Sequence, residues 1–311
     1  MTIDLAVVLC TRNGLSRGFL DQALNSVLAQ TTPPAEVIVV DDHSEDGTPE
    51  YLRTRFPGVR VVPNPGRGLA AARNTGIRAA RSAWIAFIDD DDQWLPDKLR
   101  QQFLQIQDSP HPETTIFVAR AHRVHLCNNP FAGWPACLLR SPVLPSGALI
   151  SRALWQRIGL FDESIPHGGA YHYWIRCLQA GAEVRYSHQV LLRLGKHPQQ
   201  MTAGSRLLPN TLSIDAIRQV FLESLPFHQA RHLRGALRLT GCRALAFHNN
   251  FRAIADYWSA SPLRPAHFSW RACVFFMLDT LACRAPVRMR LWLCRQGVSI
   301  LLTGRCASGI D

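Results

Sequence analysis

The chain has 311 residues, and its 34 Lys and Arg against 23 Asp and Glu residues give a formal net charge of +11. Hydrophobic residues make up 47% of the chain and charged residues 18%, a balance that argues against long disordered segments. We therefore expect one α/β domain of about 200 residues followed by a helical extension.

The cysteines and the apolar runs bear on the cellular compartment. Nine cysteines with no CxxC pair cannot all pair within one chain, which predicts reduced thiols and a cytoplasmic location. The N-terminal run carries an acid and no basic flank, so it indicates a first strand rather than a signal peptide. The most apolar later window, Ala272 to Cys283, is well short of the ~20 residues that cross a bilayer. No membrane-spanning segment is expected.

Apolar, β-branched runs alternate with helical patterns over residues 1–120, which is typical of βα units and a mostly parallel sheet. The expected strands are Leu5–Leu9, Glu36–Val40, Val59–Val62 and Trp84–Ile88. The expected helices cover 18–30, 47–55 and 68–81, and another opens near Pro96. Each strand runs into polar or glycine-bearing residues, and ligands of open α/β sheets bind at this carboxyl edge.

The second half of the chain has a different pattern. Residues 110–145 predict an irregular connection that contains a strand near Thr115–Ala119. After it we expect a strand at Ala148–Ile150, helices at Arg152–Ile158 and Tyr171–Ala180, and a strand near Glu183–Tyr186. From about residue 206 the pattern is helical. The predicted organisation is a domain over 1–205, with a donor half 1–120 and an acceptor half 121–205, and a helical extension over 206–311.

Four consecutive aspartates, Asp89 to Asp92, follow the last strand of the first half. Their mutual repulsion raises some of their pKa values unless a cation lies between them. Hard oxygen ligands favour Mg²⁺ or Mn²⁺, which keeps waters and bridges substrate phosphates. Asp89 and Asp91 are the expected ligands. The alternative is a solvated acidic turn that caps the helix opening near Pro96.

A second acidic pair, Asp41 and Asp42, ends another predicted strand. Ser44 and Asp46 suit the cap of the following helix. Because capping does not account for two further acids at the strand end, we expect Asp42 to contact the ligand.

The segment Gly66–Ala71 follows a strand and opens a helix, with Asp89 about 20 residues further on. This arrangement imitates a dinucleotide-binding fingerprint, so an NAD-dependent oxidoreductase is a distant alternative. Against it, the segment lies in the third βα unit, and Asp89 belongs to a four-acid cluster better suited to a metal. Arg67 and Arg73 suit phosphate or nucleobase contacts, or are surface arginines.

Five segments in this order resemble the family-2 glycosyltransferases, which are inverting enzymes with the A-type nucleotide-diphospho-sugar transferase fold. They are Val7–Asn13, Ser26–Thr31, Glu36–Ser44, Gly68–Ile77 and Ile85–Pro96. The resemblance implies a Rossmann-like sheet flanked by helices and transfer of a sugar from a nucleoside-diphosphate donor, a UDP-sugar first of all. It also implies a Mg²⁺ or Mn²⁺ cofactor and a glycan or lipid-linked acceptor, as in the biosynthesis of cell-envelope polysaccharides.

The resemblance implies roles only for matching positions. The nucleotide-binding residues would be Thr11, Arg12, Asn13, Asp42, Ser44, Arg73, Asp89 and Asp90, with Asp42 on the base and Arg73 beside the nucleotide. Asp89 and Asp91 resemble the family's Asp-x-Asp pair, which binds the donor ribose and the metal. His197 resembles a position that lies near the metal in some members, although a lone histidine also suits a structural role.

The chain departs from the family at the catalytic base. Members usually carry an aspartate six positions before the arginine of a Trp-x-Arg motif, here Arg176, and an acid beside it; this chain has Ala170 and Gly169 there. Three accounts remain open. A relocated base is His172 or His167; Asp162 or Glu163 replaces the missing acid; or the protein binds a sugar nucleotide with impaired turnover.

Aromatic and basic residues alternate in the C-terminal region, which fits helices that rest on a membrane surface. The residues concerned are Trp270, Phe275, Phe276, Leu278, Trp292 and Leu293, with Arg271, Arg284, Arg288, Arg290 and Arg295. An internal helical bundle is the competing interpretation. The first places the protein peripherally on the inner face of the cell membrane. Nucleic acid is not an expected partner, because the basic region has no recognisable module and the predicted pocket is acidic.

Overall fold

The computed structural model describes residues 3–122, 135, 137–138, 141–197, 207–227 and 230. The chain divides into two units, residues 1–218 and 219–311, and the first carries the sheet. The aromatic and basic residues between 270 and 295, and the segment 123–134 of the predicted irregular connection, lie outside the described residues. The domain boundary expected between residues 205 and 206 stays a prediction.

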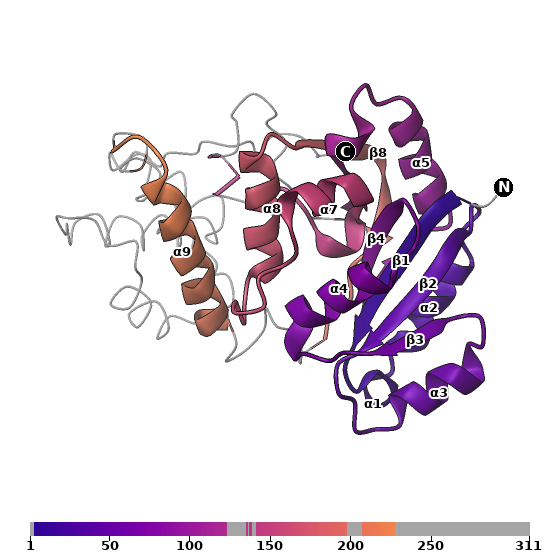
Figure 1. Cartoon of the computed structure of the whole chain (residues 1–311). Coiled ribbons are helices and arrows are strands. Elements are labelled where there is room, and N and C mark those ends of the chain that lie inside the picture. The colour runs from indigo at the N-terminus through magenta and orange to yellow at the C-terminus, as the bar shows by residue number, and fades with distance from the viewer. Residues whose placement is uncertain are drawn as a thin grey trace, which may run out of the picture. The chain divides into compact units, whose positions relative to one another are not determined.

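One sheet of eight strands organises the first unit, in the order β3-β2-β1-β4-β7-β6-β8-β5 (Figure 1). The strands are β1 Ile3–Thr11, β2 Pro34–Asp41, β3 Arg60–Pro63, β4 Trp84–Asp89, β5 Gln93–Trp94, β6 Thr115–Ala121, β7 Ala148–Ser151 and β8 Glu183–Arg193. Strands β3, β2, β1 and β4 pair in parallel, and so do β6 and β8. Strand β7 runs antiparallel to β4 and β6, and β5 runs antiparallel to β8. The α/β class is confirmed, and the sheet is parallel over β3, β2, β1 and β4 and mixed beyond β4.

The helices agree with the predicted positions, except that a short helix before residue 18 was not predicted and the helix expected over 18–30 is shorter. They are α1 Gly14–Arg17, α2 Leu20–Leu28, α3 Thr48–Arg55, α4 Gly68–Ala79, α5 Lys98–Gln107, α7 Arg152–Ile158, α8 Gly169–Gln179 and α9 Leu207–Glu223. The single helix expected over 18–30 begins only at Leu20, because Gly18 adopts a left-handed φ of 74° and ends α1. Glycine tolerates that conformation, whereas other residues resist it.

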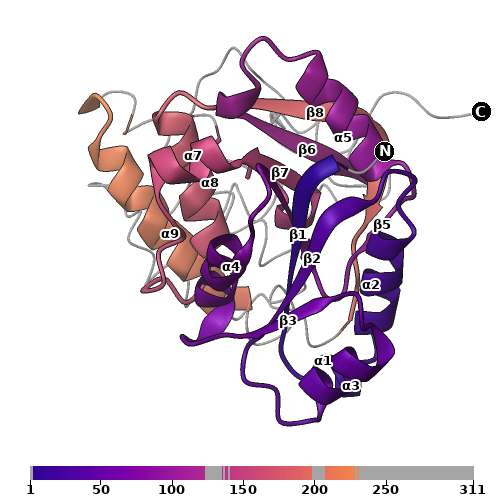
Figure 2. The ribbon, with the colours of Figure 1, turned by 45° about the vertical axis from the view of Figure 1, so that its right-hand side comes forward.

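Helices cover both faces of the sheet, as Figure 2 shows. Leu5, Val7 and Leu9 of β1 face one apolar layer, in which α2, α3 and α5 contribute buried side chains. Ala6 and Val8 of the same strand face the other layer, which α4, α7 and α8 fill. Successive side chains of a strand point to opposite faces, so a strand covered on both sides is continuously apolar. This burial fixes β1 at the centre and leaves its carboxyl end free to carry polar residues.

Glycine 76 lets α4 approach β1 closely. A Cβ atom at Gly76 would overlap the side chain of Val8. We expect Gly76→Ala to lower the free energy of unfolding by about 1–3 kcal/mol, because overpacking outweighs the better helix propensity of alanine. At Gly58 an added Cβ meets nothing within 4 Å, so Gly58→Ala is the control and should stay within about 0.5 kcal/mol of the parent. Denaturant unfolding measures both; equal midpoints for the two variants would contradict the argument.

Within the described residues no helix is both long and apolar enough to cross a bilayer. Cys10, Cys137 and Cys177 are buried and do not form disulfides. Burial raises the pKa of Cys10 and of Cys177 to about 12, so both are protonated and unreactive at neutral pH.

Candidate donor-binding site

The candidate site lies where β1, β2 and β4 end side by side. In the register of the sheet Cys10 of β1 lies beside Asp89 of β4, and Thr11 lies beside Asp41 of β2. The backbone N–H of Asp42 donates to the carbonyl of Thr11 at 2.8 Å, which extends this pairing by one residue. The predicted polar segments therefore meet at one edge of the sheet.

The carboxylate of Asp42 is held by the loop that opens α4. The Asn64 amide donates to Asp42 Oδ1 at 2.7 Å, and the backbone N–H of Gly68 donates to Oδ1 and Oδ2 at 3.1 and 3.0 Å. Asp42 is 9% exposed, so these donors compensate a largely buried charge. In a dinucleotide fingerprint the glycine N–H groups face the pyrophosphate instead. The N–H of Gly68, the first residue of α4, thus binds Asp42, which counts against the NAD-dependent alternative.

Two neighbouring loops are tied together at the outer rim of the site. The backbone N–H of Asn13 donates to Ser44 Oγ at 2.7 Å, and the N–H of Glu45 donates to Asn13 Oδ1 at 2.8 Å. Asn13 has a left-handed φ of 54°. The predicted capping role of Ser44 is wrong, because its hydroxyl binds the β1 loop and the N-cap of α3 is Gly47. Arg12, next to Asn13, is exposed.

Asp46 accepts hydrogen bonds from both α1 and α3 beside these two loops. Its Oδ1 accepts from the backbone N–H of Thr48 at 3.1 Å, and its Oδ2 accepts from the N–H of Ser16 at 2.8 Å. Burial acts to raise the pKa of Asp46, but the side-chain and backbone hydrogen bonds from Thr48 and Ser16 outweigh it and lower that pKa to about 2. Asp46 therefore satisfies the first turn of α3 without occupying the N-cap position itself.

Asp89 pairs with an arginine of α4. Arg73 Nη2 donates to Asp89 Oδ1 at 2.8 Å, and the Arg73 side chain is 5% exposed while that of Asp89 is 32% exposed. The backbone N–H of Asp89 donates to Ser146 Oγ at 3.0 Å. One carboxylate oxygen is thereby fixed from the interior, and the carboxyl group keeps an accessible side for a ligand.

Asp90 and Asp92 point into the protein. Asp90 Oδ2 accepts from Thr11 Oγ1 at 2.7 Å and from Arg17 Nη1 at 3.0 Å. Asp92 Oδ1 accepts from the backbone N–H of Gly195 at 2.8 Å. Burial raises the pKa of Asp90 to about 6 and that of Asp92 to about 7. The alternative of a solvated turn that caps the next helix is wrong, because both residues are buried and the N-cap of α5 is Asp97.

Asp91 meets His197 from the segment that follows β8. His197 Nε2 lies 2.9 Å from Asp91 Oδ2, and the Phe19 ring stacks on the imidazole with centroids 5.0 Å apart. A Cβ atom at Gly195 would overlap the carbonyl oxygen of Asp91, so glycine permits this close approach. Asp89 bonds Arg73 instead, and in the part of the chain that the structure describes no three His, Cys, Asp or Glu side chains form a metal-binding group. Two of the three predicted ligands therefore lie together.

The residues of the predicted acceptor half that concern the catalytic base lie around the start of α8. A Cβ atom at Gly169 would lie 3.8 Å from both Ala70 Cβ and the carbonyl oxygen of Asp162. Ala70 belongs to the first turn of α4, so the position of the missing acid borders the donor site. Ala170 packs against the apolar layer below.

The other base candidates differ in their surroundings. His172 is half-buried; burial and then Arg176 lower its pKa, while Asp162 opposes them. Asp162 Oδ1 accepts from the backbone N–H and the hydroxyl of Ser164, which lowers the pKa of Asp162. The backbone carbonyl of His167 accepts from the Ser213 hydroxyl at 2.7 Å.

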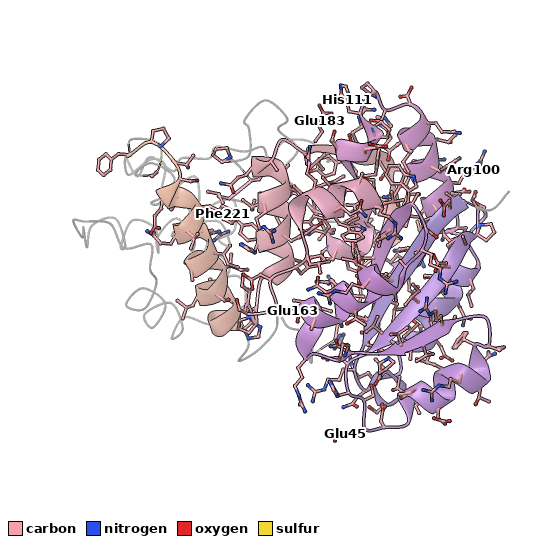
Figure 3. All side chains as sticks on the ribbon, viewed as in Figure 1. Glu45, Arg100, His111, Glu163, Glu183 and Phe221 are labelled. Atoms are coloured by element: carbon pink, nitrogen blue, oxygen red, sulfur yellow. The ribbon has the colours of Figure 1, made fainter. Side chains whose placement is uncertain are left out.

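Asn74 anchors the segment that leads to α8. Its Nδ2 donates to the Phe161 carbonyl at 2.9 Å and to Glu163 Oε1 at 2.7 Å, and its Oδ1 accepts from the Phe161 N–H at 2.9 Å. Glu163, labelled in Figure 3, is thus tied to α4. The residues that sequence reasoning missed are Arg17, Phe19, Asn64, Asn74 and Ser146. Asn74 stands inside a quoted motif, but the others have partners too distant in sequence for any local pattern to show.

The raised pKa of Asp92 has a consequence for stability. A folded-state pKa of about 7, above the unfolded value of about 4, means that the folded state binds the proton more tightly, so this group costs stability as pH rises from about 4 to 7. Asp92→Asn keeps the oxygen that accepts from Gly195 and removes the ionisation. Without metal, the variant should be more stable than the parent by about 2 kcal/mol or more at pH 8, and by much less at pH 4.5. Urea unfolding with a chelator measures this; a difference that does not change with pH would refute the assignment, and Asp108→Asn is the exposed control.

Comparisons with known proteins extend this picture. Residues 6–121 match the family model described as glycosyl transferase family 2. The succinoglycan biosynthesis protein ExoO of Rhizobium meliloti is 42% identical over 100 residues, which cover 32% of this chain and 28% of ExoO. RP339 of Rickettsia prowazekii, described as an uncharacterized glycosyltransferase, is 24% identical over 212 residues, which cover 64% of this chain and 65% of RP339. The alignments thus span less than two thirds of either relative.

Two solved structures share the fold. The mannosyltransferase PcManGT from Pyrobaculum calidifontis, in complex with GDP-Man and Mn²⁺, gives a TM-score of 0.61 at 18% identity and covers 96% of this chain and 85% of its own. TarS residues 1–349 from S. aureus, in complex with UDP-GlcNAc, gives 0.58 at 17% identity and covers 84% and 82%. The molecule therefore has the A-type glycosyltransferase fold. Over residues 6–121, the chain is similar to glycosyl transferase family 2.

Proposed function

We propose that the chain transfers a sugar from a nucleoside-diphosphate donor to a glycan or lipid-linked acceptor with the help of a divalent cation. The observation that carries the proposal is the contact between Asp91 and His197, 2.9 Å apart, at the strand edge that also holds the Arg73–Asp89 pair. The similarity of residues 6–121 to glycosyl transferase family 2 supports the reaction class.

The donor half supports a nucleotide pocket. Asp42 and the exposed Arg12 stand on adjacent loops for the base, and Asp89 has an accessible side for the ribose. Arg73, buried against Asp89, holds that carboxylate in a fixed orientation. The two structural neighbours were solved with UDP-GlcNAc and with GDP-Man, so they support a sugar nucleotide without choosing the base. A UDP-sugar is our first choice.

The residues at Asp91 fit a divalent cation. A carboxylate oxygen and an imidazole nitrogen face each other at 2.9 Å, and Mg²⁺ or Mn²⁺ is commonly bound by one or two side chains with phosphates and waters completing the shell. Such an ion, when bound, stabilises the charge of the departing nucleoside diphosphate. His197 is kept in place by Phe19 on its face. Asp89 contributes to the ribose side rather than to this pair.

On the acceptor side we assign the general base to His172. A pKa below its usual value of about 6.5 keeps the imidazole neutral at pH 7, so the ring can accept the acceptor's proton. Asp162 is engaged by Ser164, and Glu163 by Asn74, so both are weaker candidates. His167 remains the other imidazole. The absence of an acid at Gly169 and Ala170 favours the alternative of a sugar-nucleotide-binding protein with impaired turnover.

The acceptor is proposed at the level of chemical class. ExoO is named for succinoglycan biosynthesis, and TuaG of Bacillus subtilis, 38% identical over 93 residues, is named a putative teichuronic acid glycosyltransferase. Both names support a growing polysaccharide or its lipid-linked precursor as acceptor, used on the cytoplasmic face of the membrane. The basic C-terminal region is the proposed site of peripheral membrane contact.

Donor turnover tests the proposal. In the presence of Mn²⁺ the full chain should hydrolyse one member of a panel of UDP- and GDP-sugars, or transfer its sugar to an acceptor. A chelator should stop the reaction. Ala170→Asp separates the two candidate functions: activity in the parent supports the enzyme, and activity in the variant alone supports the impaired protein. If neither protein turns over or binds any donor in the panel, both candidate functions are wrong.

A further inference from the structure

Arg17, the last residue of α1, places its guanidinium inside the acidic cluster. Nη1 lies 3.0 and 3.1 Å from the two carboxylate oxygens of Asp90. Nη2 lies 3.4 Å from His197 Nε2, the atom that also lies 2.9 Å from Asp91 Oδ2. The Arg17 side chain is 27% exposed, and that of Asp90 is 9% exposed. A permanent positive charge therefore borders His197, whose imidazole contacts Asp91, the other proposed metal ligand.

This contact conflicts with a bound cation. Arginine only donates hydrogen bonds and stays charged at any working pH. If His197 Nε2 carries its proton toward Asp91, it faces the guanidinium without a hydrogen bond. If Nε2 instead offers its lone pair to a metal, a divalent ion and the guanidinium lie within a few ångströms and repel each other. Arg17 and the metal cannot both hold this position at low energy.

A diphosphate resolves the conflict. Arginine forms bidentate hydrogen bonds with phosphate as readily as with carboxylate. When Arg17 leaves Asp90, the hydroxyl of Thr11, which donates at 2.7 Å, still serves that carboxylate. Arg17 is also partly exposed and stands one residue before Gly18, a left-handed position that ends α1. Arg17 can thus exchange Asp90 for a diphosphate, and its partly exposed position at the end of α1 allows its side chain to reach one.

We infer that Arg17 is an internal counter-cation that opposes metal binding until a nucleoside diphosphate draws it away. This inference rests on the proposed function, because it takes Asp91 and His197 as the metal pair. It makes donor and metal bind cooperatively: the diphosphate draws the guanidinium away from the metal position, and the metal repels the guanidinium toward the diphosphate. By thermodynamic reciprocity the donor raises metal affinity by the same factor by which the metal raises donor affinity.

Metal titrations with three proteins test the inference. Mn²⁺ is titrated by calorimetry into the parent, Arg17→Met and Arg17→Lys, without nucleotide. Arg17→Met should bind Mn²⁺ at least about tenfold more tightly than the parent, which is about 1.4 kcal/mol, because a full charge beside the site is gone. Arg17→Lys keeps the charge and should bind weakly like the parent. Arg100→Met, an exposed arginine of α5, is the control and should match the parent.

The same titrations with saturating UDP measure the coupling. UDP should raise the Mn²⁺ affinity of the parent by a factor about tenfold larger than it does for Arg17→Met, since only the parent has a guanidinium to displace. A purely structural tether between α1 and Asp90 would change the melting temperature without changing this factor. If Arg17→Met is too unstable to titrate, the double variant Arg17→Met with Asp90→Asn is titrated instead, because it also removes the carboxylate that has lost its partner.

The outcomes separate the two proposals. Equal Mn²⁺ affinities and equal coupling factors in the parent and Arg17→Met overturn the role of Arg17 and leave the proposed function intact. Weaker binding in Arg17→Met also overturns it, because it would show that the guanidinium supports the metal. No Mn²⁺ binding by any of the proteins, with or without UDP, overturns the metal-assisted function itself and the inference with it.

Discussion

Replacing His172 by alanine should lower the transfer rate by about 10²- to 10⁴-fold, the usual contribution of a positioned general base. Donor binding should be unchanged, because the donor-side residues Asp42, Asp89 and Asp91 belong to other elements. The readout is kcat for transfer at saturating donor and Mn²⁺, together with UDP affinity. His188→Ala, at an exposed position of β8, is the matched control and should keep the parent rate.

The pH dependence of the transfer rate tests the same assignment of His172 as the general base. A general base works when deprotonated, and burial and Arg176 lower the pKa of His172 below its usual value of about 6.5. The rate of the parent should therefore be level near pH 7 and fall as the pH drops through a value below 6.5. His172→Ala should lose this acid limb. A parent profile that keeps its acid limb in the variant would remove His172 as the base and return the role to His167 or Asp162.

Asp91→Asn should lower the metal-dependent transfer rate by about 10²- to 10³-fold, because a Lewis-acid cation supplies several kcal/mol of charge stabilisation in the transition state. The amide keeps the size of the side chain and one oxygen, yet loses the charge that faces His197 at 2.9 Å. Residual nucleotide binding should become independent of Mn²⁺. Initial rates over a range of Mn²⁺ concentrations measure the effect.

Its control is Asp108→Asn, an exposed acid just after α5 that is remote in sequence from the cluster. This variant should follow the parent at every Mn²⁺ concentration. If excess Mn²⁺ restores Asp91→Asn to the parent rate, Asp91 affects only metal affinity. If the variant has the parent rate at all concentrations, Asp91 is not a ligand.

The donor half of the fold was readable because its signals are local. A strand covered on both faces is continuously apolar, so β1, β2 and β4 stand out, and their ends carry the acids. The alternation of strands and helices then fixes a parallel sheet and brings those ends to one edge. Position along the chain was enough to expect Asp42, Asp89 and Asp91 near each other before any contact was known.

The contacts within the site were not readable, because they join residues far apart in sequence. Arg17 and Asp90 are 73 positions apart, and Asp91 and His197 are 106 apart. The pairing of β5 with β8 brings Gly195 against Asp91, yet β5 has only two residues and no pattern of its own. Burial of Asp92 depends on the same distant segment. Such contacts follow from the tertiary fold rather than from local propensity.

The location of the metal tests the account most directly. Crystals of the full chain grown with MnCl₂ and UDP, measured at the manganese absorption edge, should give one strong anomalous peak between Asp91 and His197, within coordination distance of the diphosphate. A peak elsewhere, or UDP bound at the strand edge with no manganese beside Asp91, would contradict the proposed donor site.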